Sequence, residues 1–159
     1  MLTKVTDTEL KAFFFQAMRV GYANQGGRAI SGMLGHKSIQ YDNGDLHLID
    51  QWCSGNVSNN SSGMTTIWFK DRPIWVMHYW GNYADSATSF LKDALMQCYK
   101  HDLFYGGRGP LVCPGPDGLL YRNQYTSNRF ERFAGREEIV SLPGATVLGW
   151  HEYAGMSLA

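Results

Sequence analysis

Asp50 is the ionisable residue with the most apolar surroundings in this sequence. A strand over Asp45–Trp52 would place it on the same face as Leu46, Leu48 and Trp52. A carboxylate on such a face is costly unless it is paired or hydrogen-bonded, and its pKa otherwise rises. Two interpretations remain open: a structural aspartate that accepts backbone or tyrosine hydrogen bonds, or a general base or hydroxyl-binding group.

Arg108 stands in an unusual run of small residues, Gly106-Gly107-Arg108-Gly109-Pro110. Glycines let a backbone approach its neighbours closely and proline restricts it, so this loop can hold one guanidinium in a fixed place. A fixed guanidinium is suited to clamping a carboxylate or phosphate. The alternative is an internal salt bridge, for example to Glu137, that fixes the loop.

Glu137 and Glu138 are adjacent carboxylates in a segment that alternates with Ile139 and Val140. Paired carboxylates can carry out acid–base chemistry. Adjacent residues of a strand point to opposite faces, however, so these two cannot form a dyad. We expect one of them to point inward and the other to be solvated.

Three more polar side chains complete the candidate site. Tyr121 and Asn123 are two residues apart and share a strand face, where they could bind a ligand, although such pairs are also ordinary in sheets. Tyr79 shares its face with apolar neighbours, whereas His78 is more typical of a core histidine than of a catalyst. The candidate ligand-binding residues are Asp50, Tyr79, Arg108, Tyr121, Asn123 and Glu137.

Familiar catalytic and cofactor motifs are absent. The nearest phosphate-loop candidate, Gly27 to Gly32, follows a predicted helix and continues with Met33, and there is no G-x-S-x-G elbow. His151-Glu152 is not followed by a second histidine, the five histidines are scattered, and the three cysteines form no C-x-x-C pair. We therefore expect no metal and no cofactor, and no catalytic residue is assigned.

Composition narrows the class of protein. The 159 residues are 44% hydrophobic and 18% charged, with 14 basic and 14 acidic side chains. A net charge of zero disfavours nucleic-acid binding by this chain alone and leaves self-association as a homodimer open. The N-terminus lacks the apolar run of a signal peptide, and no stretch has the roughly 20 apolar residues that cross a bilayer. We expect a cytoplasmic protein with free thiols and no membrane contact.

Two amphipathic helices and a series of strands must position these residues. A capping box at Thr6–Glu9 opens the first helix, and Asp85 or Ser86 caps the second. Apolar residues recur at helical spacing after each cap: Leu10, Phe13, Phe14, Ala17 and Met18, then Ala87, Phe90, Leu91, Ala94, Leu95 and Cys98. Residues 23–37, 55–63 and 105–118 are rich in small or polar residues and are predicted loops.

The strand pattern predicts an α+β fold. The expected strands are Ser38–Tyr41, Asp45–Trp52, Met64–Lys70, Ile74–Trp80, Leu119–Thr126, Arg129–Phe133, Glu137–Leu142 and Thr146–Tyr153. Short hairpins make the sheet mainly antiparallel, and we expect one domain over residues 1–159 with about seven strands, strong curvature and both helices on one face. Because Ile74–Trp80 is apolar on both faces, the opposite face should also be covered.

The whole string of segments resembles a known but uncharacterised family. Five segments carry the resemblance: YDNGDLHLID from Tyr41, PIWVMHYWG from Pro73, FLKDAL from Phe90, Tyr105–Pro110, and the RN…FERFAGREEI run that ends at Ile139. The family is a bacterial domain of unknown function, found alone or fused behind helix-turn-helix DNA-binding domains. The resemblance implies no known activity, and the fusion to DNA-binding domains suggests, by association only, a domain that senses a small ligand. It also implies a glutamate near Thr65, so this chain would lack part of any site that uses it.

Three functions agree with these patterns. The leading hypothesis is a small-molecule-binding or regulatory domain with an aromatic-walled pocket formed by the candidate residues above. The second is a hydrolase or isomerase that uses Asp50 or Glu137 as general base and Arg108 as a clamp for an anionic substrate. The third is a structural homodimer that buries the second apolar face of the sheet.

Overall fold

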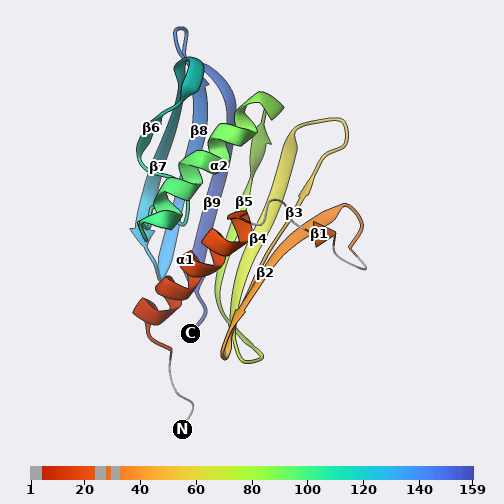
Figure 1. The fold of residues 1–159 in the computed structure, drawn as a ribbon, viewed down its shortest axis with the longest axis vertical. Coiled ribbons are helices and arrows are strands. Elements are labelled where there is room, and N and C mark those ends of the chain that lie inside the picture. The colour runs from red at the N-terminus through yellow and green to blue at the C-terminus, as the bar shows by residue number, and fades with distance from the viewer. Residues whose placement is uncertain (1–4, 24–27, 30–32) are drawn as a thin grey trace.

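The computed structural model describes residues 5–23, 28–29 and 33–159, and Figure 1 shows two long helices and a single sheet. The elements are α1 (Asp7–Ala23), β1 (Arg28–Ala29), β2 (His36–Asn43), β3 (Leu46–Ser54), β4 (Asn60–Phe69), β5 (Arg72–Tyr83), α2 (Asp85–Lys100), β6 (Val112–Pro114), the 3-10 turn η1 (Pro116–Gly118), β7 (Leu119–Arg129), β8 (Arg132–Ser141) and β9 (Thr146–Ser157). Residues 24–27 and 30–32 of the predicted loop at 23–37 lie outside the described residues, and in the remainder β1 and the start of β2 are strands where a loop was expected.

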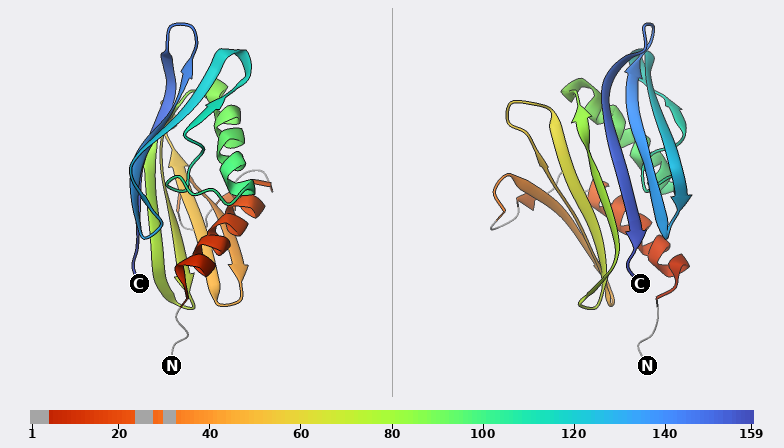
Figure 2. Two further views of the ribbon diagram at one scale, coloured as in Figure 1. Left: turned by 90° about the vertical axis from the view of Figure 1, so that its left-hand side faces the viewer. Right: turned by 180° about the vertical axis from the view of Figure 1, so that it is seen from behind.

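All strands pair antiparallel in the order β1-β2-β3-β4-β5-β9-β8-β7-β6. Two meanders, β1–β5 and β6–β9, meet where β5 pairs with β9. The α+β class and the antiparallel sheet are therefore confirmed, and both helices lie on one face (Figure 2). The expected strand number and curvature are wrong: eight strands of three or more residues are joined by the two-residue β1, and the sheet is open and twisted without strong curvature.

Sequence composition explains most of the misplaced strands. The edge strands β1 and β6 lie inside segments so rich in glycine and proline that their pairing was not predicted. Residues 134–136, which separate two of the expected strands, lie within β8, which runs unbroken from Arg132 to Ser141. The segment 55–63 is only partly a loop, because β4 already begins at Asn60. The start of β4 at Asn60 matters for the cavity described below.

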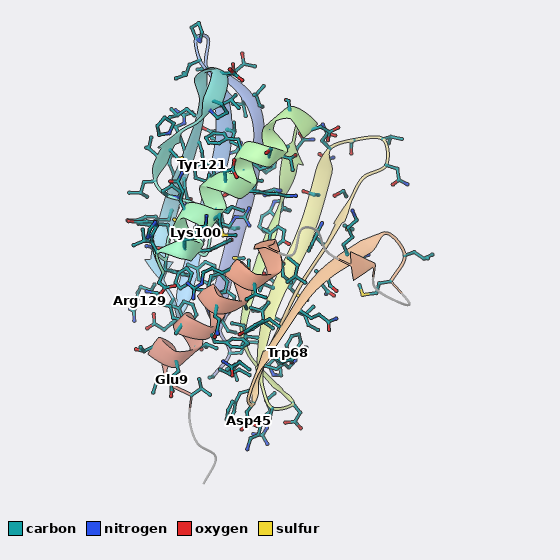
Figure 3. The ribbon with its side chains drawn as sticks, viewed as in Figure 1. Glu9, Asp45, Trp68, Lys100, Tyr121 and Arg129 are labelled. Carbon is teal, nitrogen blue, oxygen red and sulfur yellow. The ribbon has the colours of Figure 1, made fainter. Side chains whose placement is uncertain are left out.

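The two helices bury the apolar stripes that the sequence predicts. In the capping box of α1, the Thr6 backbone N–H donates to the Glu9 carboxylate at 2.9 Å, and the Glu9 N–H donates to the Thr6 hydroxyl at 3.2 Å. Figure 3 shows Glu9 at the start of this helix. At α2 the predicted side-chain cap is wrong, since Ala84 occupies the N-cap position and Asp85 is the first helical residue. The stripe of α2, from Ala87 to Cys98, is nevertheless buried as expected.

Aromatic rings form the centre of the core between the helices and the sheet. Trp75 on β5 is fully buried, and its ring stacks on Phe130 and Phe133 with centroids 5.2 and 5.3 Å away. Its indole N–H donates to the Phe130 carbonyl at 3.0 Å. Phe14 of α1 packs against the same indole at 5.3 Å. These contacts fix α1 against β5 by burying large rings without leaving a polar group unsatisfied.

The face of the sheet that points away from the helices is open. Alternate residues of β5 divide between the two faces, so Trp75, Met77 and Tyr79 are buried. On the far face His78 is exposed and Trp80 retains 41% of its accessible surface. The described residues therefore provide no second cover for the sheet. Within the same residues, neither helix has the length and apolar character to cross a membrane.

Candidate functional site

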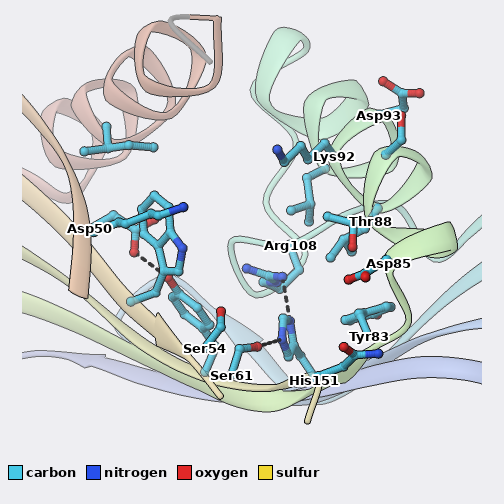
Figure 4. Close-up of a pocket in the computed structure, with 18 of the residues that line it drawn as sticks. Asp50, Ser54, Ser61, Tyr83, Asp85, Thr88, Lys92, Asp93, Arg108 and His151 are labelled. Atoms are coloured by element: carbon cyan, nitrogen blue, oxygen red, sulfur yellow. Dashed lines mark hydrogen bonds between the residues drawn. The ribbon is translucent and has the colours of Figure 1, made fainter. Parts of the chain in front are cut away.

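A cavity of about 840 Å³ lies between α2 and the helix-facing side of the sheet. Its wall includes Thr88 and Lys92 of α2, and its floor includes Asp50, Tyr79 and His151 from three different strands (Figure 4). Ligand sites generally occupy about 300–1,000 Å³ and combine apolar walls with a few convergent polar groups.

Asp50 is nearly fully buried, at 2% exposure, and is held by two neutral donors. The Thr65 hydroxyl donates to its Oδ1 at 3.1 Å, and the Tyr79 hydroxyl donates to the same oxygen at 2.8 Å. No hydrogen bond from the described residues reaches Oδ2. Burial raises the pKa of Asp50, and the two hydrogen bonds and the more distant charge of Arg108 oppose that rise only in part.

Tyr79 reaches Asp50 because the strand between them carries a glycine. Gly63 of β4 pairs with Tyr79 of β5, and the phenol ring leans across it toward β3. A Cβ at Gly63 would lie 2.3 Å from both the Tyr79 hydroxyl and its ring carbon Cζ. The Asp50–Tyr79 hydrogen bond therefore requires a glycine at position 63.

Arg108 is held by the loop between α2 and β6, as its glycine-rich sequence predicts. Gly106 and Gly107 both adopt positive φ, at 65° and 70°, a conformation that other residues rarely tolerate. The Arg108 guanidinium forms an ion pair with Glu137, and both side chains are at most 3% exposed. Its Cζ also lies 5.2 Å from the centroid of the Tyr79 ring. Arg108 therefore forms the predicted internal salt bridge and also lines the cavity.

Glu137 is a buried carboxylate with charged and polar partners on several sides. Besides Arg108, it accepts a hydrogen bond from the Tyr121 hydroxyl at 2.6 Å, and His151 Nδ1 lies 3.2 Å from its Oε1. Burial alone would raise the pKa of Glu137, but the Arg108 charge and the bonds from His151 and Arg108 lower it to about 2. Glu138 is half-buried and pairs with Arg122, so the inward position of one glutamate is confirmed but the other is not simply solvated.

Asn123 and Tyr121 support the site from behind the cavity. The Asn123 amide donates to the carbonyls of Tyr105 and Gly109, at 3.0 and 2.9 Å, and thereby fixes both ends of the Arg108 loop. The Tyr121 hydroxyl accepts the Gly109 N–H at 2.9 Å while donating to Glu137. Of the six predicted residues, Asp50, Tyr79 and Arg108 line the cavity, and Tyr121, Asn123 and Glu137 hold Arg108 in place.

Ser61, Tyr83 and His151 also line the cavity, and sequence reasoning missed all three. The Ser61 Oγ lies 3.0 Å from His151 Nε2. Burial lowers the pKa of His151, and the neighbouring Glu137 opposes that shift. Tyr83 is 6% exposed, packs edge-on against the His151 ring at 4.8 Å, and its hydroxyl has no hydrogen-bond partner among the described residues.

The signals for these missed residues were weak but present. Ser61 falls in a segment of small polar residues that the sequence predicts as a loop, and His151 is part of no zinc motif. Gly63 and Gly81 sit inside strands, where glycine often marks the close approach of another group. No three histidine, cysteine, aspartate or glutamate side chains of the described residues cluster closely enough to hold a metal ion.

Comparison with known proteins identifies a family but no function. The model of a family described as a domain of unknown function, DUF5680, matches residues 54–156. No curated protein and no solved structure matches the chain. The matched segment runs from the end of β3 into β9, so it includes Ser61, Arg108 and His151 but not Asp50.

Proposed function

Because the chain belongs to the DUF5680 family, whose description assigns no activity, we propose a function from the cavity: the protein binds a small polar molecule between α2 and the sheet. The observation that carries this proposal is the state of Asp50. Its carboxylate is buried at the cavity floor, both hydrogen bonds go to one oxygen, and the other oxygen receives none from the described residues. Because Asp50 also lines the cavity, this second oxygen is in a position to accept a hydrogen bond from a ligand.

The chemistry of the cavity indicates the kind of ligand. Asp50 Oδ2 accepts hydrogen bonds, so it favours a ligand hydroxyl or amine. The Tyr83 hydroxyl offers a further polar contact, and Trp52 supplies an apolar wall. Arg108 adds little attraction for anions because Glu137 already balances its charge. We therefore propose a neutral or cationic polar molecule, in preference to the anionic substrate that Arg108 alone would suggest.

A regulatory role is the second half of the proposal. The resemblance to bacterial domains that occur behind helix-turn-helix segments supports a domain whose ligand state is transmitted to a partner domain. The position of α2 is consistent with this role, since the helix forms one wall of the cavity and a ligand there would contact it directly (Figure 4). A ligand can shift such an equilibrium only by binding one arrangement more tightly than another.

Native mass spectrometry of freshly purified protein tests the binding proposal. We expect a small molecule bound to the wild type. In Asp50→Asn the affinity for this molecule should fall by about tenfold or more. Asparagine keeps the acceptor for Tyr79 but replaces Oδ2 by an amide donor, so it reverses the hydrogen-bond polarity at the cavity. Asp45→Asn is the matched control, because Asp45 is exposed and lies in the turn between β2 and β3.

If the protein is purified without a ligand, a thermal-shift panel of small polyols, amines and amino acids takes the place of the first measurement. A ligand at about one hundred times its Kd should stabilise the fold by about 2.7 kcal/mol. Equal binding by wild type and Asp50→Asn would refute the role of Asp50. The absence of both a bound mass and any thermal shift across the panel would refute the binding function.

A further inference from the structure

Four residues on four neighbouring strands form one row across the helix-facing side of the sheet. In the strand registers Ser61 of β4 pairs with Gly81 of β5, Gly81 pairs with His151 of β9, and His151 pairs with Glu137 of β8. Directly opposed residues point to the same face. The row therefore brings a hydroxyl, an imidazole and a carboxylate into line, although they lie far apart in the sequence.

Gly81 allows the imidazole to reach the serine. The His151 ring crosses the β5 backbone, and a Cβ at Gly81 would lie 2.8 Å from its Cδ2 and 1.9 Å from the Trp150 carbonyl. With that space open, His151 Nε2 lies 3.0 Å from Ser61 Oγ, and Nδ1 lies 3.2 Å from Glu137 Oε1. Both distances are those of hydrogen bonds.

From this row we infer that Ser61 is an acyl-accepting nucleophile, with His151 as its general base and Glu137 as the positioning residue for His151. The same arrangement of serine, histidine and acid performs acyl transfer on unrelated folds, and it is recognised by geometry and roles. The inference goes beyond ligand binding: it uses the same cavity but does not require a resident ligand. The substrate class is a small carboxylic ester.

The surroundings suit each group to its role. Ser61 is half-buried and lines the cavity, so an ester carbonyl can approach its Oγ. Burial keeps the His151 ring neutral near pH 7, and Glu137 stays ionised. Tyr83, packed edge-on against His151, carries a buried hydroxyl with no partner among the described residues. That hydroxyl is the donor available to the carbonyl oxygen as negative charge develops.

The reaction proceeds in two balanced steps. In the first, Ser61 Oγ bonds to the ester carbonyl carbon while its proton passes to His151 Nε2. The bond to the leaving alkoxide then breaks, and the alkoxide takes that proton and departs as an alcohol. In the second, water adds to the acyl carbon and gives a proton to Nε2. The bond from Oγ to carbon breaks, Ser61 regains the proton, and a carboxylic acid is released.

The tautomer of His151 decides whether the row can work in this way. A proton on Nδ1, donated to Glu137, leaves Nε2 free to accept the Ser61 proton. Arg108 Nη2 lies 3.3 Å from the same Nδ1, and a bond from it would place the proton on Nε2 instead. Nitrogen-15 NMR of the wild-type imidazole distinguishes these states. The inference expects an unprotonated Nε2, and a protonated Nε2 would overturn it.

Covalent labelling provides the direct test. The full chain is incubated with diisopropyl fluorophosphate, and separately with 4-nitrophenyl acetate, and is then followed by intact mass and peptide mapping. We expect one adduct on Ser61 and release of nitrophenol. Both should be lost in Ser61→Ala and unchanged in Ser62→Ala, because Ser62 is the adjacent exposed residue on the opposite face.

His151→Asn should slow labelling by about 100-fold or more, the usual contribution of a general base. Tyr83→Phe should slow ester turnover by a similar factor without preventing the adduct. Both variants are first checked for cooperative unfolding. If His151→Asn does not fold, the wild-type tautomer and the Ser61→Ala comparison decide the question. Absence of an adduct on Ser61 with both reagents would overturn the inference, even where a ligand binds.

Discussion

Two carboxylates are buried on the same face of this sheet, and their environments shift their pKa values in opposite directions. Asp50 accepts hydrogen bonds from two neutral donors of the described residues, and burial raises its pKa. Glu137 has an ion pair with Arg108 and a contact with His151, and its pKa falls to about 2. Burial is nearly complete for both, so the difference comes from the neighbouring charges and hydrogen bonds, first of all the Arg108 guanidinium, and not from the depth.

This difference separates the two residues by role. Glu137 stays ionised, does not line the cavity and fixes the groups around it, so it is unsuited to act as a general base. Asp50 lines the cavity, and one of its oxygens receives no bond from the described residues, so its ionisation costs stability that a ligand donor could restore. One carboxylate therefore stabilises the architecture of the site, and the other is available to contact a ligand.

The largest expected effect comes from neutralising Glu137. Glu137→Gln leaves the Arg108 guanidinium buried without its counter-charge, which should lower the free energy of unfolding by about 3–5 kcal/mol. Urea denaturation at pH 7 measures the loss. Glu138→Gln is the matched control, because its partner Arg122 is 40% exposed and such a pair contributes about 1 kcal/mol or less. Equal losses in the two variants would mean that the buried Arg108–Glu137 pair contributes no more to stability than the exposed Arg122–Glu138 pair.

The same substitution should change the acid sensitivity of the fold. The pKa of Glu137 is lowered from 4.5 to about 2, so its contribution is present above pH 4.5 and is lost as the pH falls toward 2. At about 1.4 kcal/mol per pKa unit, this amounts to about 3 kcal/mol. Denaturation curves of wild type and Glu137→Gln should therefore converge between pH 4.5 and 2. Parallel curves over that range would show that Glu137 does not cause the acid loss.

The contribution of Asp50 to stability should depend on pH in the opposite direction. A raised pKa means that its contribution is favourable below pH 3.8 and is lost as the pH rises through the folded-state value. Asp50→Asn should therefore stabilise the ligand-free protein at pH 7, and the gain should vanish below pH 3.8. Asp45→Asn is the matched control, because Asp45 is exposed. Destabilisation by Asp50→Asn at pH 7 would contradict the contrast between the two carboxylates.

How far the sequence predicts this site depends on the range of the interactions. Asp50, Arg108 and Glu137 could be chosen from local pattern, because an acid on an apolar face or an arginine among glycines is visible within a few residues. Ser61 and His151 could not, since their meeting depends on a register across four strands and on Gly81 between them. The helices were predicted well for the same reason: their stripes are local. Strand boundaries failed wherever a glycine inside a strand imitated a turn, as at Gly135.

The smallest expected effect tests the coupling between Asp50 and Thr65, the position where the family resemblance implies a glutamate. Thr65→Val removes a 3.1 Å hydrogen bond to Oδ1 and should cost about 1–2 kcal/mol while Asp50 is ionised. In an Asp50→Asn background the acceptor is neutral, so the same substitution should cost less, by about 0.5–1 kcal/mol. Thr66→Val, on the opposite face, is the control that should show no coupling. If Thr65→Val costs the same in both backgrounds, Asp50 is not ionised at pH 7. Its ligand must then accept a hydrogen bond from the protonated acid and not donate one.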